Sequence, residues 1–249
     1  MSRFRLDIAY NGKNFSGYQI QPNKRTIQEE IEKVLSFLLK ENVRIYASGR
    51  TDAGVSAFQQ VAHFDSEIEF DLKKVTDSLN ALLPDDISVL KMTETSLEFD
   101  ARFSAKKKTY QYFFYVSKYK HPIFDEYAQR INSYADVEKM KQGAKFLVGT
   151  FDFKSFVSKK SGKTNFVRTI YSAKIVNISK DVYAFEITGN GFLYNMVRII
   201  FGTLVKVAYG KIEPEKVLDI ILAEDRSKSG QTMPPKALYL KNVDYGDVR

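Results

Sequence analysis

Segments with the two-residue period of a strand alternate with segments of helical period along the whole chain, and this alternation constrains its fold most. Residues 3–10 are apolar at every second position, as in a strand with one buried face. Residues 27–39 carry an apolar stripe at helical spacing, and Thr26 with Glu29 predicts a capping box at its start. Such interleaving favours an α+β fold in which helices pack on a mainly antiparallel sheet.

The pattern divides near residues 100–106, which predicts an N-terminal half of residues 1–104 and a C-terminal half of residues 105–249. In the first half we expect further strands at 43–47, 60–64 and 86–93 and a helix at 72–83. In the second half we expect strands at 109–116, 167–178, 182–188 and 239–243, and helices at 137–147, at 193–209 and from Pro214.

The charge of the chain points to a polyanionic partner. Lys and Arg number 38 against 30 Asp and Glu, which gives a net charge of +8. Cations placed near phosphates release counterions, so a basic balance favours nucleic acid. The 15 Tyr and 19 Phe add rings that can stack on unpaired bases, although most belong in a core. Composition by itself leaves a merely soluble basic protein open.

Several classes of function are disfavoured by what the sequence lacks. The chain has no cysteine, which excludes disulfides, thiolate metal sites and cysteine nucleophiles. It contains neither of the common glycine-rich phosphate-binding motifs, so enzymes that use nucleotide cofactors lose support. No apolar run approaches the roughly 18 residues of a membrane span. The charged N-terminus predicts a strand rather than a signal peptide, and a cytoplasmic protein without metal fits best.

One short loop holds the strongest candidate for chemistry. Gly49 and Gly54 bracket Arg50, Thr51 and Asp52 directly after an apolar strand segment. Glycines permit close backbone approach, and charged residues on a loop held by a rigid scaffold can face a ligand. By itself the pattern is equally satisfied by a plain turn in which Asp52 caps local amides and Arg50 is solvated.

The sequence around this loop resembles the TruA family of tRNA pseudouridine synthases. Residues 47–55, Ala-Ser-Gly-Arg-Thr-Asp-Ala-Gly-Val, are similar to the family signature. The resemblance continues in the same order along the chain, at residues 10–19, 99–105, 190–198 and 237–240. Several spaced motifs over nearly the whole chain are far more specific than any one of them.

The resemblance implies a reaction and a fold. Members of the family turn uridine into pseudouridine in the anticodon arm of tRNA, at positions 38–40. This isomerisation detaches the uracil and rejoins it through carbon, and it needs no cofactor and no metal. The implied pseudouridine synthase fold joins the sheets of two halves around an RNA-binding cleft. Members are typically homodimers in which one tRNA touches both subunits.

The resemblance also implies the catalytic residues. Asp52 matches the family's catalytic aspartate, which can attack or stabilise the sugar carbon or take a proton from the ribose, and the sequence leaves these routes open. Arg198 matches the arginine that pairs with this aspartate, and its apolar neighbours predict a buried edge. Tyr110 matches the active-site tyrosine, whose ring can stack on the extruded uracil and whose hydroxyl can assist proton transfer.

Further cations are candidates for RNA contacts. Arg50 is expected to contact the RNA backbone or help to push the target base out of its stack. Lys106, Lys107 and Lys108 directly precede Tyr110, and either phosphate contacts or an ordinary solvated face would explain them. A second candidate patch consists of Lys159, Lys160, Lys163 and Arg168. The two histidines, His63 and His121, are expected to be structural.

The sequence departs from the family pattern at a few positions. Ser56 stands where members often carry histidine, Phe58–Gln59 replace smaller residues, and Tyr18 replaces a frequent tryptophan. None of these changes removes a catalytic group. They leave open which uridines are modified, since the strand after the aspartate loop shapes the site.

Two other functions are compatible with parts of the sequence. A non-catalytic RNA-binding protein or tRNA chaperone would keep the fold, but it would have no reason to keep Asp52, Arg198 and Tyr110 together. A carboxylate-using hydrolase acting on glycosides would need a second carboxylate as its acid. The candidates for that role, none of which stands in a supporting pattern, are Asp7, Asp65 and Asp100.

Overall fold

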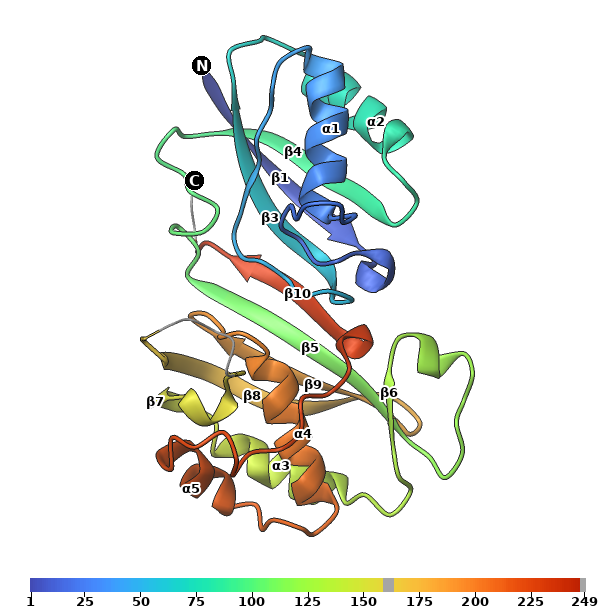
Figure 1. Cartoon of the computed structure of the whole chain (residues 1–249), viewed down its shortest axis with the longest axis vertical. Coiled ribbons are helices and arrows are strands. Elements are labelled where there is room, and N and C mark those ends of the chain that lie inside the picture. The colour runs from blue at the N-terminus through green and yellow to red at the C-terminus, as the bar shows by residue number, and fades with distance from the viewer. Residues whose placement is uncertain (159–163, 247–249) are drawn as a thin grey trace. The chain divides into compact units, whose positions relative to one another are not determined.

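The computed structural model describes residues 1–158 and 164–246, which form two compact units (Figure 1). Unit 1 consists of Met1–Lys106 together with the C-terminal residues from Tyr239 on, and unit 2 of Lys107–Leu238. The last strand of the chain therefore belongs with the N-terminal unit. Of the residues predicted to contact RNA, Lys159, Lys160 and Lys163 lie outside the described residues.

Unit 1 is a mainly antiparallel sheet with helices on one face (Figure 1). In the order of the sheet, its strands are β4 (Ile87–Thr95), β1 (Ser2–Tyr10), β3 (Ser56–Ser66) and β10 (Leu238–Asp244), with the short β2 (Tyr46–Ala47) also paired to β3. Its helices are α1 (Ile27–Leu39), α2 (Leu72–Leu82) and the short 3-10 helix η1 (Gly12–Asn14).

The first amides of α1 are bonded to a loop of unit 1. Thr26 is the N-cap residue, as expected, but its side chain makes no capping hydrogen bond, so the predicted capping box is wrong. Loop carbonyls accept the first two amides of the helix instead. Ile27 N–H donates to the Gly17 carbonyl at 3.3 Å, and Gln28 N–H donates to the Tyr18 carbonyl at 2.9 Å.

The strand expected at residues 43–47 is shortened for a similar reason. Ser36 Oγ accepts the N–H of Val43 at 3.0 Å, and Glu32 Oε1 accepts the N–H of Ile45 at 2.9 Å. Both donors are thus bonded to side chains of α1 instead of to a neighbouring strand. Only Tyr46–Ala47 remains as β2.

Unit 2 also consists of strands with helices on one face (Figure 1). In the order of the sheet, its strands are β5 (Lys107–Val116), β9 (Val182–Gly189), β8 (Val167–Ser179) and β7 (Gly149–Asp152), with β6 (Gln129–Ile131) parallel to β5. Its helices are α3 (Val137–Lys145), α4 (Met196–Ala208) and α5 (Lys216–Leu222), with the 3-10 helices η2 (Phe124–Glu126), η3 (Lys154–Phe156) and η4 (Pro235–Ala237).

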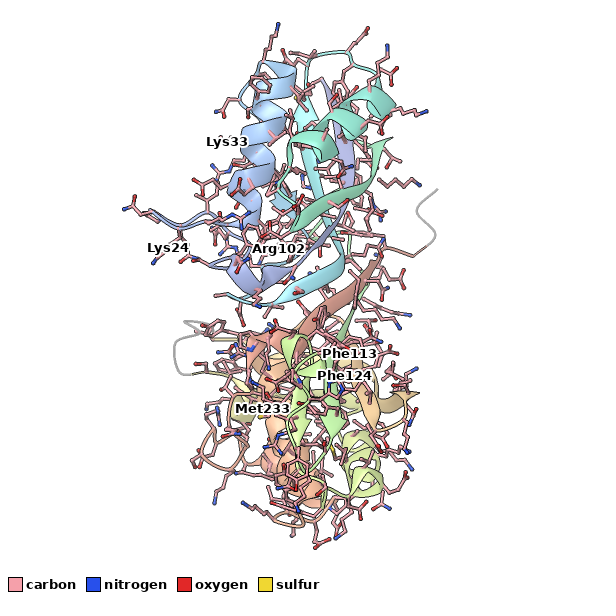
Figure 2. All side chains as sticks on the ribbon, turned by 90° about the vertical axis from the view of Figure 1, so that its right-hand side faces the viewer. Lys24, Lys33, Arg102, Phe113, Phe124 and Met233 are labelled. Carbon is pink, nitrogen blue, oxygen red and sulfur yellow. The ribbon has the colours of Figure 1, made fainter. Side chains whose placement is uncertain are left out.

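The core of unit 2 forms between β5 and α4. Tyr112 and Phe114 are completely buried and pack on Phe201 of α4, with ring centres 4.2 and 5.1 Å apart. On the other face of β5, Phe113 and Phe124 pack against a small buried cluster and lie side by side (Figure 2). Strand β5 therefore has apolar contacts on both faces, which explains its dense run of aromatic residues.

The predicted α+β fold is confirmed. Strands β6 and β7 were not predicted, because three or four residues are too few to show a period. Within the part of the chain that the structure describes, no helix has the length and apolar character needed to cross a membrane.

Candidate active site

Asp52 lies in a tight turn of unit 1 between β2 and β3. Its carbonyl accepts the N–H of Val55 at 3.1 Å, and Gly54 within this turn has a φ of 76°, which favours glycine. The preceding residue, Thr51, is buried, and its hydroxyl lies 2.8 Å from the hydroxyl of Tyr10 on β1. The half-buried Asp52 is thereby held in position through the backbone on both sides.

The segment that follows β1 packs directly against this turn. Tyr18 N–H donates to the Thr51 carbonyl at 3.1 Å, and Gly54 N–H donates to the Phe15 carbonyl at 3.3 Å. These two segments both carry residues that resemble the family pattern. The structure thus brings together two motifs that lie about thirty residues apart in the sequence and fixes Asp52 between backbone contacts.

Two glycines make this close approach possible. A Cβ on Gly12 would lie 2.0 Å from the carbonyl oxygen of Val55, and a Cβ on Gly17 would lie 2.9 Å from that of Thr51. Gly17 also has a φ of 102°. In addition, the N–H of Gly12 donates to Ser56 Oγ at 3.0 Å. Ser56, one of the departures from the family pattern, therefore serves to hold the loop that supports Asp52.

Buried polar groups lie beside the aspartate turn and help to hold it. Gln60 on β3 is fully buried, and its Nε2 donates to the Gly49 carbonyl at 2.8 Å. Burial raises the pKa of Tyr10 to about 12 and holds the pKa of Tyr18 well above its ordinary value. Both phenols therefore stay neutral beside the aspartate loop at physiological pH.

The other departures from the family pattern lie near this turn or within the core. Tyr18 is buried, and Phe58 stacks on Tyr239 of β10 with ring centres 5.0 Å apart. Phe58, Ser56 and Asp85 are among the residues that line a hollow of about 330 Å³ in unit 1. Ser56 and Phe58 thus contribute to a hollow formed by the strand that follows the aspartate loop.

Arg198 lies in the first turn of α4 in unit 2, half-buried as its apolar neighbours indicated. Its Nε donates to the Met233 carbonyl at 2.6 Å, and its Nη1 donates to Asn195 Oδ1 at 2.6 Å. Asn195 precedes the helix with a φ of 61°. Two separate hydrogen bonds therefore orient the guanidinium group.

Tyr110 lies on the same side of unit 2 as Arg198. It shares the α4-facing side of β5 with Tyr112, and its ring meets Phe192 edge-on at 5.1 Å, just before α4. The hydroxyl of Tyr112 donates to the Pro234 carbonyl at 2.9 Å. Burial raises the pKa of Tyr112, and the nearby positive charge of Arg198, which acts in the opposite direction, only partly offsets this rise. Tyr110 thus lies beside the segment that leads into α4, the helix that carries Arg198, and a joint catalytic role of the two residues stays a prediction.

The predicted RNA-contacting cations have varied surroundings. Arg50 is exposed next to Asp52, and Lys106 is exposed at the end of the first segment of unit 1. The Nζ of Lys107 lies 5.7 Å from the ring centre of Tyr171. Lys108 is half-buried on β5. Arg168 is half-buried on β8, where its guanidinium donates to main-chain carbonyls and burial lowers its pKa. RNA contact by these residues stays a prediction.

Both histidines have structural surroundings, as expected. His63 is buried, its Nδ1 accepts the N–H of Ala101 at 3.1 Å, and burial lowers its pKa. The ring of His121 stacks on Phe124 with ring centres 4.1 Å apart. Among the described residues, 1–158 and 164–246, no cluster of three His, Cys, Asp or Glu side chains could hold a metal ion.

The carboxylates that a hydrolase would need are engaged elsewhere. Asp7 and Asp65 pair with Arg5 and Arg3 at 2.8 and 2.6 Å, respectively. Asp100 accepts the amides of the two residues at 102 and 103. Each of these groups stabilises the fold of unit 1, which weakens the hydrolase alternative.

Sequence reasoning missed the groups that support the site. The roles of Tyr10, Gly12 and Gly17 in holding the aspartate turn, and of Asn195 and Met233 in orienting Arg198, were not predicted. Four of these five lie within segments that resemble the family pattern, at residues 10–19 and 190–198. That resemblance was the available signal, whereas nothing in the sequence links Met233 to Arg198.

Comparison with known proteins then decides the family. A family model described as tRNA pseudouridine synthase matches residues 8–104 and 144–246. The chain belongs to the tRNA pseudouridine synthase family. It is therefore an isomerase, and the two matched stretches contain Asp52 and Arg198.

Curated relatives match this synthase over its whole length. It is 42% identical over 248 residues to a tRNA pseudouridine synthase A of Exiguobacterium sp., covering 100% of both chains. It is 44% identical over 245 residues to a tRNA pseudouridine synthase A of Bacillus subtilis, covering 98% of this chain and 99% of that one. Among solved structures, a chain of a Cbf5-Nop10-Gar1 complex is 14% identical with a TM-score of 0.34, over 95% of this chain and 57% of that one. A likeness that weak carries no argument about this synthase.

Proposed function

We propose that this synthase isomerises uridine to pseudouridine at positions 38–40 in the anticodon arm of tRNA, with Asp52 as its catalytic carboxylate. The observation that carries the proposal is the Asp52 turn, which the backbone of a second family-like segment holds in place. It stands in a chain that matches the family along its length. A carboxylate fixed in this manner suits a reaction that needs one ionised group at a defined position.

The chemistry requires one bond to break and another to form. The bond between uracil N1 and the ribose carbon C1′ breaks, and the detached base turns. C5 then bonds to C1′, the hydrogen on C5 leaves as a proton, and N1 takes up a proton, so the product is an isomer of the substrate. Asp52 acts at the sugar, either on C1′ as a nucleophile or as the base that takes a ribose proton. Both routes use its ionised form.

Arg198 and Tyr110 complete the proposed catalytic set. A guanidinium next to a carboxylate favours its charged form and fixes its direction through paired hydrogen bonds. The hydrogen bonds of Arg198 to Met233 and Asn195 orient it for such a role. Tyr110 offers a half-buried ring on which the extruded uracil can stack.

The remaining proposals concern the residues that bind tRNA and the state of the protein when it does so. Arg50, Lys106, Lys107, Lys108 and Arg168 are proposed to contact the RNA backbone, in line with the net charge of +8. We also propose a homodimer in the cytoplasm that binds tRNA without a metal or cofactor. Sedimentation of the protein with and without tRNA tests the dimer.

Tritium release tests the proposed function. With tRNA labelled at uracil C5, the wild-type protein should release label, because C5 loses its hydrogen only when the base rejoins through carbon. Asp52→Ala and Asp52→Asn should bind the same tRNA and release none. If wild type binds tRNA but releases no label from any anticodon-arm uridine, the synthase assignment is wrong and a non-catalytic RNA-binding protein replaces it.

A further inference from the structure

Two pairs of arginine and aromatic side chains in unit 1 are exposed and are not used by the proposed reaction. The guanidinium carbon of Arg44 lies 6.0 Å from the ring centre of Tyr46, and that of Arg102 lies 5.2 Å from the ring centre of Phe103. All four side chains are exposed, with Tyr46 at 53% and Phe103 at 79%. We call these four residues the arginine–aromatic patch.

His63 joins the two pairs. Its ring stacks on that of Tyr46 at 5.4 Å and 24°, and its Nδ1 accepts the N–H of Ala101, the residue directly before Arg102. His63 itself is only 4% exposed. One pair therefore contacts this buried ring of β3 directly, and the loop that carries the other pair is hydrogen-bonded to the same ring.

The loop that presents Phe103 is firmly held. The carboxylate of Asp100 accepts the N–H groups of Arg102 and Phe103 at 2.7 and 2.8 Å. The Tyr245 hydroxyl donates to the Ala101 carbonyl at 2.7 Å. A large apolar ring is thus held in water by a loop whose backbone is tied on both sides, and fraying does not explain its exposure.

The surroundings of the patch leave its positive charge in place. Asp100 is engaged with the two amides of its own loop, and Asp65 forms an ion pair with Arg3 at 2.6 Å. Burial lowers the pKa of His63, which keeps that ring neutral at physiological pH. The two exposed arginines therefore favour an anionic partner.

A single exposed hydrophobic side chain is common on protein surfaces and needs no function. Phe37 on α1 is such a residue, with 73% exposure. The patch differs because each of its rings lies beside an arginine. Rings stack on unpaired bases, and arginine binds phosphate through paired hydrogen bonds and packs on flat rings.

We propose that the arginine–aromatic patch binds an unpaired nucleotide of the tRNA other than the target uridine, with the base stacked on Phe103 and the phosphates held by the arginines. This proposal rests on the proposed function, because that function supplies tRNA as the partner. The patch then contributes to affinity for tRNA and leaves the chemical step unchanged.

Binding of tRNA to matched variants tests the patch. Because stacking of a base on an aromatic ring is worth about 1–3 kcal/mol, Phe103→Ala should weaken the Kd for tRNA at least about fivefold. Phe103→Tyr keeps the ring and should bind within twofold of wild type. Phe37→Ala, the control at a similarly exposed phenylalanine, should also bind as wild type does. Single-turnover tritium release at saturating enzyme should be unchanged in all three.

The salt dependence of tRNA binding tests the two arginines of the patch. Arg44→Ala and Arg102→Ala should each lower the slope of log K against log salt by about one, as expected when one phosphate contact is lost. All of the substituted side chains are exposed, so the melting temperatures should stay at the wild-type value.

The outcomes separate this proposal from the proposed function. If Phe103→Ala binds tRNA as wild type does, the patch proposal is overturned, whether or not wild type releases tritium. It is also overturned if the variant changes the oligomeric state in sedimentation without changing tRNA affinity, because the patch would then contact a second copy. If wild type releases no tritium and Phe103→Ala still weakens tRNA binding, the patch stands and the synthase function fails.

Discussion

The two units hold their key charged residues in different ways. In unit 1, Asp52 is positioned by the backbone, through the turn closed at Val55 and the close approach of Gly12. In unit 2, Arg198 is positioned through its own side chain, by hydrogen bonds to Asn195 and to the Met233 carbonyl. A short aspartate side chain moves largely with its backbone, whereas a long arginine side chain also needs contacts at its tip to be oriented. Substitutions should therefore harm the two residues by different routes.

The largest effect is expected where a side chain would enter the backbone contact of unit 1. In Gly12→Ala, the new Cβ would lie 2.0 Å from the Val55 carbonyl oxygen, so the aspartate turn must move. Displacement of a catalytic group by about 1 Å can reduce the rate about 100-fold, and we expect a loss of that size in single-turnover tritium release.

Gly210→Ala is the matched control. Gly210 has a φ of 65°, but nothing lies within 4 Å of its added Cβ. This variant should lose about 1 kcal/mol of stability from backbone strain and keep its rate. If both variants were equally active, the contact between Gly12 and Val55 would not position Asp52.

The next largest effect is expected from the support of Arg198. Asn195→Gly keeps a backbone with a φ of 61° accessible but removes the oxygen that accepts from Nη1. Loss of a hydrogen bond to a charged group is worth about 1.5–3 kcal/mol, so tritium release should fall at least about tenfold. Asn23→Gly, at an exposed asparagine with a φ of 56°, is the control and should be fully active. Equal rates for the two variants would show that Arg198 needs no help from Asn195.

A smaller effect is expected when a side chain that supports the backbone of unit 1 is shortened. Ser56→Ala leaves the buried N–H of Gly12 without its acceptor, which should lower the free energy of unfolding by about 1–3 kcal/mol in urea. Ser88→Ala, at an exposed serine, should change it by less than about 0.5 kcal/mol. A loss no greater than that of Ser88→Ala would contradict the role given to Ser56.

The smallest effect is expected from the hydroxyl that bonds to Thr51. Tyr10→Phe should lower the free energy of unfolding at neutral pH by about 1 kcal/mol. Because burial raises the pKa of Tyr10 from 10.0 to about 12, the folded chain keeps its proton in a window where the unfolded chain loses it. Stability of the wild type should thus fall as pH rises from 10 to 12, and less steeply in the variant. If thermal denaturation showed wild type and Tyr10→Phe losing stability equally between pH 10 and 12, the buried position of the phenol would be contradicted.

The sequence could predict those elements whose pattern is local. The strand β1 and the helix α1 were predicted correctly, because burial of one face of an element places apolar residues at regular intervals in the sequence. The capping box predicted at Thr26 does not form, and the carbonyls of Gly17 and Tyr18 accept the first two amides of α1 instead. Such a contact between distant segments leaves no local period.

The residues of the candidate site also divide into those that the sequence could predict and those that it could not. Asp52 and Arg198 could be named because each lies in a segment that resembles a known family, and Tyr110 because it follows such a segment. The partner of Arg198 at Met233 could not, because it is a main-chain carbonyl 35 residues away and any residue type supplies one. Likewise, the need for Gly12 becomes visible only when the Val55 carbonyl is seen beside it.

The assignment of β10 to unit 1 has a consequence for synthesis of the protein. Unit 2 is a single continuous stretch, Lys107–Leu238, whereas unit 1 combines Met1–Lys106 with Tyr239 and the residues after it. During synthesis, the sheet of unit 1 can therefore be completed only after all of unit 2 has been made, when Tyr239 and Leu240 of β10 can pair with Ser56 and Ala57 of β3. A nascent chain that stops before Tyr239 would hold an aspartate-bearing unit that lacks a strand.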